Sequence, residues 1–383
     1  RETLALKKVQ DCEWISAMLP PGAGRNVIDP RVVSLYSCVG QTFPDSDTVE
    51  IIYKKILEFK FAEFTDTIRE AARSLPKATM ELQNECRIKL ARTPAKFHYM
   101  FNLRDLSRVF GGLWQADPGK VDTQVKIVRM WRNECCRVYG DKLITEGDRD
   151  IVTVQKLPEL IKARFSQAAT EALADPILFG DFADAARILD EEDKPWLGER
   201  FYDDLGSSYA TVQDVANKVL ASYNEKNTQP MYLVLFNDAI SHLCRVHRII
   251  RLPRGNALLV GVGGSGKQSL SRLATYMAGY GWCSEISLTR GYGNEQFCED
   301  LKDFFMPIVD KAKPVTMLFT DAHVAQESFL EYVNNILTVG TVPGLYDEGE
   351  QEDLKSKFSK LHPEITKGAA PTRLWKMTVD YLR

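Results

Sequence analysis

Apolar residues in the first half of the chain recur every three or four positions, the spacing of one face of an amphipathic helix. This pattern predicts helices at residues 46–73, after Pro76, around 103–110 with an end at Gly111 and Gly112, and at 124–139. Residues 141–173 share the helical pattern but carry more charge. We therefore expect an all-helical subdomain over residues 44–150, followed by connecting helices and a linker over residues 151–230.

The second half alternates between short apolar runs and helical patterns. Apolar runs at residues 256–260, 283–288 and 315–321 are typical of buried strands. Helical patterns flank these runs at residues 212–227, 233–250, 270–277, 295–311 and 327–337. Alternating strands and helices predict a parallel α/β sheet that binds its ligand at the carboxyl ends of the strands.

Turn-forming and charged stretches interrupt these patterns. Residues 13–18 predict a strand that enters a rigid, proline- and glycine-rich turn at residues 20–26. The composition becomes loop-like around residues 175–181 and acidic at 190–196, which makes this region the candidate linker. The helix at 233–250 ends in a basic cluster that we expect to face solvent or to lie near phosphate: Arg245, His247, Arg248 and Arg251.

Composition indicates a globular protein of more than one domain. The length of 383 residues corresponds to two or three domains of about 150 residues each. The net charge of −3 gives no reason to expect nucleic acid or a membrane surface as a partner. No apolar run approaches the roughly 18 residues of a membrane-spanning helix. The eight cysteines include no Cys-x-x-Cys pair, so we expect free thiols in a cytoplasmic protein and no zinc site.

Residues 261–269 carry the strongest chemical signal. Their sequence, Gly261-Val-Gly-Gly-Ser-Gly-Lys-Gln-Ser269, lies between an apolar run and a helical pattern, as a phosphate-binding P-loop does. Glycines let successive backbone N–H groups surround a phosphate, the helix N-terminus adds its positive dipole end, and Lys267 supplies a mobile charge. We therefore expect nucleotide contacts from Gly261, Val262, Gly263, Gly264, Ser265, Gly266, Lys267, Gln268 and Ser269.

One position departs from the P-loop pattern. A Ser or Thr that ligates Mg²⁺ normally follows the lysine, but Gln268 stands there and Ser269 comes one residue later. One residue along a helix rotates a side chain by about 100°. We therefore expect phosphate binding to persist and metal binding to be weakened.

A carboxylate at the end of a neighbouring buried strand completes most P-loop sites, where it holds Mg²⁺ through water. Asp321 ends the apolar run that starts at residue 315 and fits this role. The Glu that activates water in hydrolases usually comes next, but Ala322 stands there and cannot accept a proton. We expect His323 to pack at the strand end and Glu327 to begin the next helix.

Other P-loop classes fit this sequence less well. A GTPase needs an Asn-Lys-x-Asp motif to bind guanine, and the Asn-Lys pair that begins at Asn217 lacks the Asp. A small-molecule kinase is a compact single domain with an arginine-rich lid, without a preceding helical subdomain. An unrelated P-loop ATPase stays open as an alternative.

The sequence around the P-loop resembles the fourth AAA+ module of an axonemal dynein heavy chain. The resemblance covers residues 255–270, including Gln268 in place of the Thr of cytoplasmic relatives. It continues through residues 290–293, 318–323, 329–337 and 342–345. Upstream, residues 97–109 are similar to the small helical subdomain of the third module, and residues 17–26 are similar to its sensor-1 loop.

This resemblance implies a segment of an ATP-driven motor in the axoneme of cilia or flagella, whose AAA+ modules form a ring that drives microtubule sliding. It implies that residues 1–43 end the third large subdomain, that 44–150 form the third small subdomain, and that 231–383 form the fourth large subdomain, incomplete at its C-terminus. ATP or ADP, with Mg²⁺, are the implied cofactors. The implied partners are other AAA+ modules, intermediate and light chains, and microtubules.

The resemblance also assigns roles to single residues. Arg104 matches the sensor-2 arginine of the third module, and Leu19 stands at the sensor-1 position, where a polar residue would sense nucleotide. Arg25 and Arg31 lie near the loop that faces the preceding module, but neither matches an arginine finger. The local P-loop then has two interpretations. It belongs to a hydrolysing motor module, or to a structural or regulatory module that binds nucleotide with little or no hydrolysis.

Overall fold

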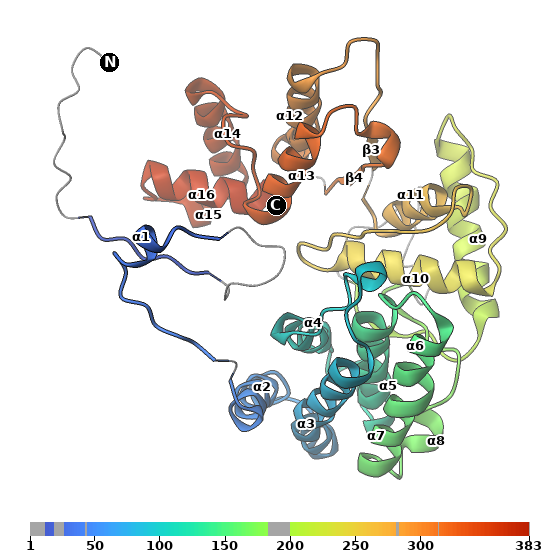
Figure 1. The fold of residues 1–383 in the computed structure, drawn as a ribbon. Helices are drawn as coiled ribbons and strands as arrows, with labels where there is room; N and C mark the ends of the chain where they lie inside the picture. The colour runs from blue at the N-terminus through green and yellow to red at the C-terminus, as the bar shows by residue number, and fades with distance from the viewer. Residues whose placement is uncertain are drawn as a thin grey trace. The chain divides into compact units, whose positions relative to one another are not determined.

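The computed structural model describes residues 12–18, 27–42, 44–182, 200–280, 283–312 and 314–382. The chain divides into two compact units, residues 1–45 and residues 46–383 (Figure 1). Within its described residues, the first unit contains one short helix, α1 (Pro30–Val33). The side chain of Asp29 caps this helix by accepting a hydrogen bond from the backbone N–H of Arg31.

The strand predicted at residues 13–18 is wrong, because residues 12–18 have no regular secondary structure. Trp14 and Ile15 are 80 % and 98 % exposed. A strand needs a hydrogen-bonded neighbour, and the described residues of this unit contain no second strand to supply one. The turn predicted at residues 20–26 lies outside the described residues.

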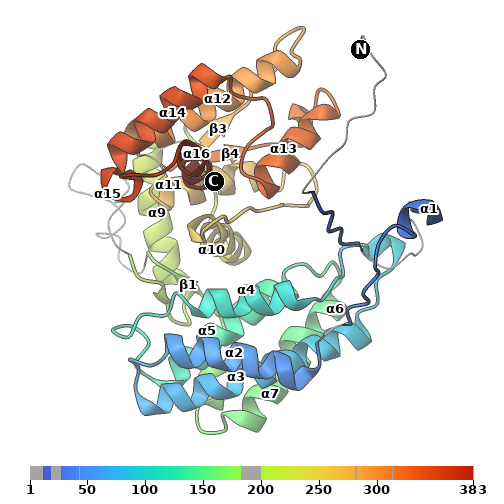
Figure 2. The same ribbon diagram turned by 90° about the vertical axis from the view of Figure 1, so that its left-hand side faces the viewer.

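The second unit begins with four helices that share one apolar core. They are α2 (Ser46–Lys60), α3 (Asp66–Lys89), α4 (Leu103–Leu113) and α5 (Gln124–Cys135). α2 packs on α3, while α3 and α4 both pack on α5; Figure 2 shows α2 and α3 side by side. The core between them contains Phe61, Leu75, Leu106 and Trp131, all nearly or fully buried. Each helix thus buries its apolar stripe, as the periodicity predicts.

Three of the predicted helix boundaries are wrong. The helix predicted at residues 46–73 is broken at residues 61–65, which separate α2 from α3. α3 continues through Pro76, because its neighbours Leu75 and Thr79 are fully buried and their packing outweighs the roughly 3 kcal/mol cost of an internal proline. α4 continues through Gly111 and Gly112 to Leu113. A Cβ at Gly112 would lie 2.0 Å from Oε2 of Glu134, so this glycine permits close helix packing rather than ending the helix.

A run of short elements follows α5. The π-helical turn Cys136–Gly140 extends α5, and then come α6 (Glu146–Asp150), a second π-helical turn (Ile151–Lys156), α7 (Leu157–Arg164) and α8 (Ala169–Ala172). β1 (Phe179–Gly180) pairs antiparallel with β2 (Asp203–Asp204). Phe179 and Phe182 are buried, so the predicted linker at residues 175–181 is a packed connection. Residues 190–196 of that linker lie outside the described residues.

Three further helices surround a second core. They are α9 (Tyr209–Lys226), α10 (Asn237–Arg251) and α11 (Lys267–Met277), close to the helices predicted from periodicity. α10 packs along α11, and α9 contacts both. Val219, Ile240, Leu243 and Leu273 are buried between them.

A two-stranded parallel sheet and five helices complete the described chain. β3 (Cys283–Glu285) pairs in parallel with β4 (Thr316–Leu318), and Ser284 lies opposite Met317. The helices are α12 (Asn294–Lys311), α13 (Ser328–Thr338), α14 (Glu348–Leu361), α15 (Pro363–Thr366) and α16 (Pro371–Leu382). Phe297 of α12 stacks on Phe329 of α13, with ring centroids 4.3 Å apart. The predicted parallel pairing is therefore present in these two strands.

The strand predicted at residues 256–260 is not formed. This segment has no partner in either of the described sheets. Leu258 and Val260 are each 89 % exposed. The prediction fails because a strand needs neighbouring backbone as well as apolar side chains, and the described residues place no strand beside this one.

Candidate functional site

The P-loop motif lies between the extended segment 256–260 and α11, which begins at Lys267. Gly264 and Gly266 have φ angles of 75° and 77°, in the left-handed region that glycine adopts most readily. A Cβ at either position would meet no atom within 4 Å, so the backbone conformation rather than lack of space requires glycine. Gly266 is the N-cap residue, which places the loop at the positive end of the helix dipole.

Lys267 lies over this loop. Its Nζ donates hydrogen bonds to the carbonyl oxygens of Gly261 (2.9 Å) and Val262 (2.6 Å) and to Oγ of Ser265 (3.2 Å). These three acceptors match the three N–H donors of the ammonium group. The structure thus places the predicted lysine against the predicted loop. The ammonium group of Lys267 contacts oxygen atoms of the loop itself.

Gln268 and Ser269 have different surroundings. Gln268 is exposed, whereas Ser269 is half-buried and lines a cavity of about 570 Å³. This cavity lies between α9, residues 227–232 and α11, and Met231, Tyr223, Tyr276 and Tyr280 also line it. A rotation of about 100° per residue accounts for the different surroundings of the two neighbouring side chains.

Asp321 lies beyond β4, in the same part of the fold as α11. α11 packs against both β3 and β4, and Asp321 opens a 3₁₀ turn, Asp321–His323, with its side chain exposed. His323 accepts a hydrogen bond at Nδ1 from the backbone N–H of Thr320 (3.2 Å) and packs against Phe319. Glu327 directly precedes α13, as predicted.

Arg104 is exposed at the start of α4. A capping box fixes this helix end: Oδ1 of Asn102 accepts from the backbone N–H of Arg104 (2.9 Å), and Asp105 accepts from the backbone N–H of Asn102 (3.1 Å). Arg31 is exposed in α1. Leu19 and Arg25, the other residues considered for nucleotide sensing, lie outside the described residues.

Few side chains of the described residues are placed to ligate Mg²⁺ at this site. Within the described ranges, no group of three His, Cys, Asp or Glu side chains could hold a metal ion. Gln268 stands at the usual hydroxyl position, so Asp321 is the one member of the expected pair that keeps its usual ligand type. In the same residues, no helix is long and apolar enough to cross a bilayer.

Known families match a long segment in each half of the chain. Residues 231–383 match the family described as "P-loop containing dynein motor region D4", and residues 77–179 match the "AAA+ lid domain". The chain is 44 % identical to human "Dynein axonemal heavy chain 10" over 98 % of this chain and 8 % of that protein. It is 43 % identical to Chlamydomonas reinhardtii "Dynein-1-alpha heavy chain, flagellar inner arm I1 complex" over 99 % of this chain and 8 % of the relative. The chain belongs to the axonemal dynein heavy-chain family.

A third dynein, human "Dynein axonemal heavy chain 6", is 40 % identical over 92 % of this chain and 8 % of its own length. The chain thus spans about 8 % of the length of the curated dyneins that it matches. The resemblance inferred from residues 255–270 is confirmed, and with it the AAA+ fold. A P-loop-containing family implies that this dynein segment binds nucleotide.

The prediction for the basic cluster of α10 is wrong for Arg248, which is 2 % exposed. Its guanidinium donates to Oε1 of Glu134 on α5 (2.9 Å) and to the carbonyl oxygen of Gly112 (3.2 Å), and lies 3.6 Å from the ring centre of Tyr202. Glu134 is fully buried and also accepts from Arg137 (2.8 Å). Glu134 precedes Arg248 by 114 residues, so no local pattern could reveal the pair.

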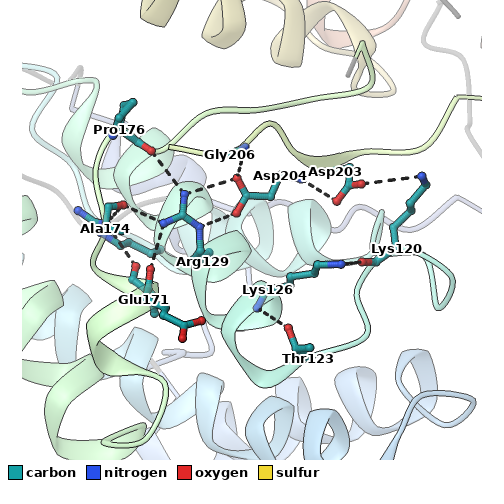
Figure 3. Close-up of polar contacts among 12 residues, drawn as sticks. Lys120, Thr123, Lys126, Arg129, Glu171, Ala174, Pro176, Asp203, Asp204 and Gly206 are labelled. Atoms are coloured by element: carbon teal, nitrogen blue, oxygen red, sulfur yellow. Dashed lines mark hydrogen bonds and ion pairs between the residues drawn. The ribbon is translucent and has the colours of Figure 1, made fainter. Parts of the chain in front are cut away.

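A second buried arginine, Arg129 of α5, ties the segment after the lid (residues 77–179) to the lid itself (Figure 3). Its guanidinium contacts both carboxylate oxygens of Asp204 in β2. It also donates to the carbonyl oxygens of Ala174 (2.8 Å), Glu171 (3.2 Å) and Pro176 (3.4 Å). The sequence contained a sign of this role, because Arg129 stands among the buried residues Ile127, Val128, Met130 and Trp131.

The prediction for the basic cluster is also wrong for His247, which is 1 % exposed and lies beside the buried carboxylate of Asp181. Burial lowers the pKa of His247 to about 4, so its imidazole is neutral at pH 7. Burial alone would raise the pKa of Asp181, but His247, Arg200 and Arg251 outweigh burial and lower it. The charge of Asp181 at pH 7 is therefore balanced by the two arginines.

Proposed function

We propose that this chain forms part of the AAA+ ring of an axonemal dynein heavy chain that uses ATP to power microtubule sliding in cilia or flagella. The family match at residues 231–383 and the axonemal relatives support this proposal. Residues 1–43 would end the third large subdomain, 44–150 form the third small subdomain, and 231–383 form most of the fourth large subdomain. Its partners would be other AAA+ modules, intermediate and light chains, and microtubules.

We further propose that the local P-loop binds ATP or ADP. The conformation of the loop supports this most directly, because Gly264 and Gly266 shape the backbone at the N-terminus of α11 and Lys267 lies over it. Backbone N–H groups and Lys267 would hold the phosphates. The cavity lined by Ser269, two residues beyond Lys267 on α11, would offer room for the rest of the nucleotide.

Hydrolysis at this site is proposed to be slow. Gln268 lacks the short hydroxyl that normally binds Mg²⁺ at this position, and Ala322 cannot activate water. A positioned general base is typically worth 10²–10⁴-fold in rate, or about 3–5 kcal/mol of barrier. Asp321 would still hold Mg²⁺ through water. The site would then serve ring geometry or regulation, which is the second of the two interpretations of the P-loop.

Nucleotide binding is tested by thermal unfolding of the dynein motor region that contains this chain, with its other nucleotide sites disabled by mutation. ADP at about a hundred times its Kd should stabilise the module by roughly 2.7 kcal/mol. Lys267→Ala should abolish the shift, whereas Arg108→Ala, at an exposed residue of α4, should preserve it. An unchanged melt of the wild-type protein at saturating ADP would overturn the proposal.

The slow turnover is tested by restoring the two missing groups. Gln268→Thr with Ala322→Glu should raise the hydrolysis rate at this site by about 10²-fold or more. Each single substitution serves as the control, because neither restores both functions. Rapid turnover by the wild-type site alone would contradict the proposal. So would turnover that requires Lys267 yet is indifferent to the restored pair.

Arg104 is proposed to contact nucleotide in the third module, whose P-loop is not part of this chain. Its exposure at a rigidly capped helix end supports this role. Arg104→Ala should reduce hydrolysis by the third module and leave ADP affinity at Lys267 unchanged. Arg108→Ala, one turn further along the same helix and also exposed, is the matched control.

A further inference from the structure

The C-terminal end of α10 carries two side chains, His247 and Arg251, that lie against one buried carboxylate, that of Asp181. Oδ2 of Asp181 accepts a hydrogen bond from Nε of Arg251 (2.6 Å) and lies 3.7 Å from Nε of Arg200. Oδ1 lies 3.3 Å from Nε2 of His247. The side chains of Asp181, Arg200 and His247 are 6 %, 1 % and 1 % exposed. Asp181 therefore holds cationic groups from α10 and from the chain that follows β1 at a site shielded from water.

Arg200 extends this cluster to the P-loop helix. Its guanidinium donates to the carbonyl oxygens of Met277 (3.0 Å) and Ala278 (2.5 Å), at the C-terminal end of α11. A cation is favourable there because helix carbonyl oxygens carry the negative end of the dipole. A second contact joins the same two helix ends, since the hydroxyl of Tyr280 donates to the carbonyl oxygen of Ile250 (3.0 Å).

These contacts lie at the opposite end of α11 from the phosphate-binding loop. α11 has 11 residues and begins at Lys267, so its two ends are roughly 16 Å apart. The segment 256–260, which leads from α10 to the loop, has no partner in the described sheets. Among the described residues, α11 is therefore held by these contacts at its C-terminal end and by its packing on α9, α10, β3 and β4.

The same cluster is connected to the lid. Asp181 directly follows β1, which pairs with β2. Asp204 of β2 contacts Arg129 of lid helix α5, as Figure 3 shows. Hydrogen bonds, ion pairs and the covalent step from β1 to Asp181 thus connect the lid to Arg200 and the end of α11.

We propose that Asp181 is a positioning residue for nucleotide binding, which holds α11 through Arg200 and so sets the geometry of the loop at residues 261–267. This proposal rests on the proposed nucleotide binding by that loop. Asp181 does not contact the loop itself. Its effect passes along α11, and it makes the affinity of the loop depend on the lid.

A merely structural ion cluster would affect stability and not affinity. Removing the Asp181 charge would then lower the unfolding temperature but leave the Kd unchanged when it is measured well below that temperature. A positioning role instead changes the Kd of the fully folded protein. The Kd for ADP in folded protein is therefore the deciding measurement.

The experiment uses the dynein motor region that contains this chain, with its other nucleotide sites disabled, and measures ADP binding by calorimetry. Asp181→Asn should raise the Kd roughly tenfold. Arg200→Lys, which keeps a charge but cannot donate to both carbonyl oxygens in the same way, should raise it severalfold. Asp203→Asn is the matched control, because Asp203 lies in β2 beside this path and its carboxylate faces Lys120 at 3.9 Å. It should bind as the wild type does.

The outcomes separate this proposal from the one on which it rests. If wild-type protein does not bind ADP, or binds it equally after Lys267→Ala, the proposed nucleotide binding fails and this inference fails with it. If binding requires Lys267 but Asp181→Asn and Arg200→Lys bind as Asp203→Asn does, the positioning role alone is refuted. Should Asp181→Asn not fold, Arg200→Lys decides the question, and it must weaken ADP binding.

Discussion

The helices of the lid and the extended segment before the P-loop have similarly apolar sequences but different surroundings. Leu106 and Trp131 in the lid region are almost completely buried, whereas Leu258 and Val260 are each 89 % exposed. A helix satisfies its backbone hydrogen bonds within itself, while a strand depends on a neighbour. An apolar stretch therefore favours burial, but it is buried only where another segment of the chain packs against it.

The two regions also use lysine and arginine differently. Near the lid, Arg129 and Arg248 are buried and bound to carboxylates of distant segments. At the P-loop, Lys267 contacts only oxygens of its own loop among the described residues. We infer that the lid side is held together by fixed long-range ion pairs, and that the loop keeps a cation that can exchange its partners.

The largest expected effect comes from breaking the buried ion pairs. Glu134→Ala would leave Arg248 without its carboxylate in a water-free site and should lower the free energy of unfolding by about 3–5 kcal/mol. Urea denaturation of the chain measures this change. Glu58→Ala, which removes ion pairs to the solvent-exposed cations of Lys55 and Arg73, should leave the midpoint nearly unchanged. Equal effects of the two substitutions would contradict the contrast between buried and exposed pairs.

Acidification should also act on the buried region. The pKa of His247 is about 4 in the folded chain, against an ordinary value of 6.5, so the unfolded chain binds more protons between these values. Stability is therefore present above pH 6.5 and falls as the pH drops toward 4, by up to about 3 kcal/mol from this group. The lowered pKa of Asp181 acts in the same direction.

Urea denaturation at pH 7 and pH 5 measures this loss. His247→Gln cannot take up the proton, so it should show a smaller loss on acidification than the wild type. The charged groups around His247 are Asp181, Arg200, Arg248 and Arg251, and all of them stay in place in this variant. Equal pH dependence in the two proteins would show that His247 is not the group responsible.

A smaller effect is expected in the P-loop. Gly266→Ala forces a residue with a Cβ into φ of 77° and should cost about 1 kcal/mol, with weaker ADP binding because the loop backbone changes. Gly263→Ala is the matched control, because a Cβ there meets no atom within 4 Å and its φ is not in the left-handed region. The two variants should differ in ADP affinity, and equal affinities would refute the conformational requirement.

The smallest effect is expected in the exposed segment. Leu258→Thr should change the free energy of unfolding by no more than about 0.5 kcal/mol, because the side chain contributes little buried area. Leu106→Ala in the buried core should cost about 2–5 kcal/mol. A large loss from Leu258→Thr in the 383-residue chain would show that residues 256–260 are covered in solution.

The sequence predicted the elements whose signals are local. Periodicity identified α5, α9, α11 and α12, and the glycine spacing located a P-loop whose lysine does lie over it. The absence of a strand at residues 256–260 was not predictable, because strand formation depends on a neighbour that the segment's own residues do not specify. The glycine at 112 looked like a helix end, although its small size serves contact with Glu134.

The long-range ion pairs escaped sequence reasoning for a related reason. Arg248 and His247 stand near a helix end in a basic cluster, which resembles a solvated face. Their partners, Glu134 and Asp181, are distant in sequence, and nothing in the sequence near an acidic residue shows which basic residue it pairs with. The two missing groups at the P-loop, in contrast, could be identified at once because Gln268 and Ala322 occupy positions defined by a short motif.

The contacts of Lys267 have a consequence for ligand selection. Because its ammonium group already holds two carbonyl oxygens and one hydroxyl, an incoming phosphate must compete with those oxygens for the same N–H groups. A single inorganic phosphate replaces few of these bonds and gains little. A diphosphate or triphosphate brings several oxygens at once and can displace all three. The loop's own oxygens therefore compete with phosphate for Lys267, and we infer that they favour ligands with more than one phosphate group.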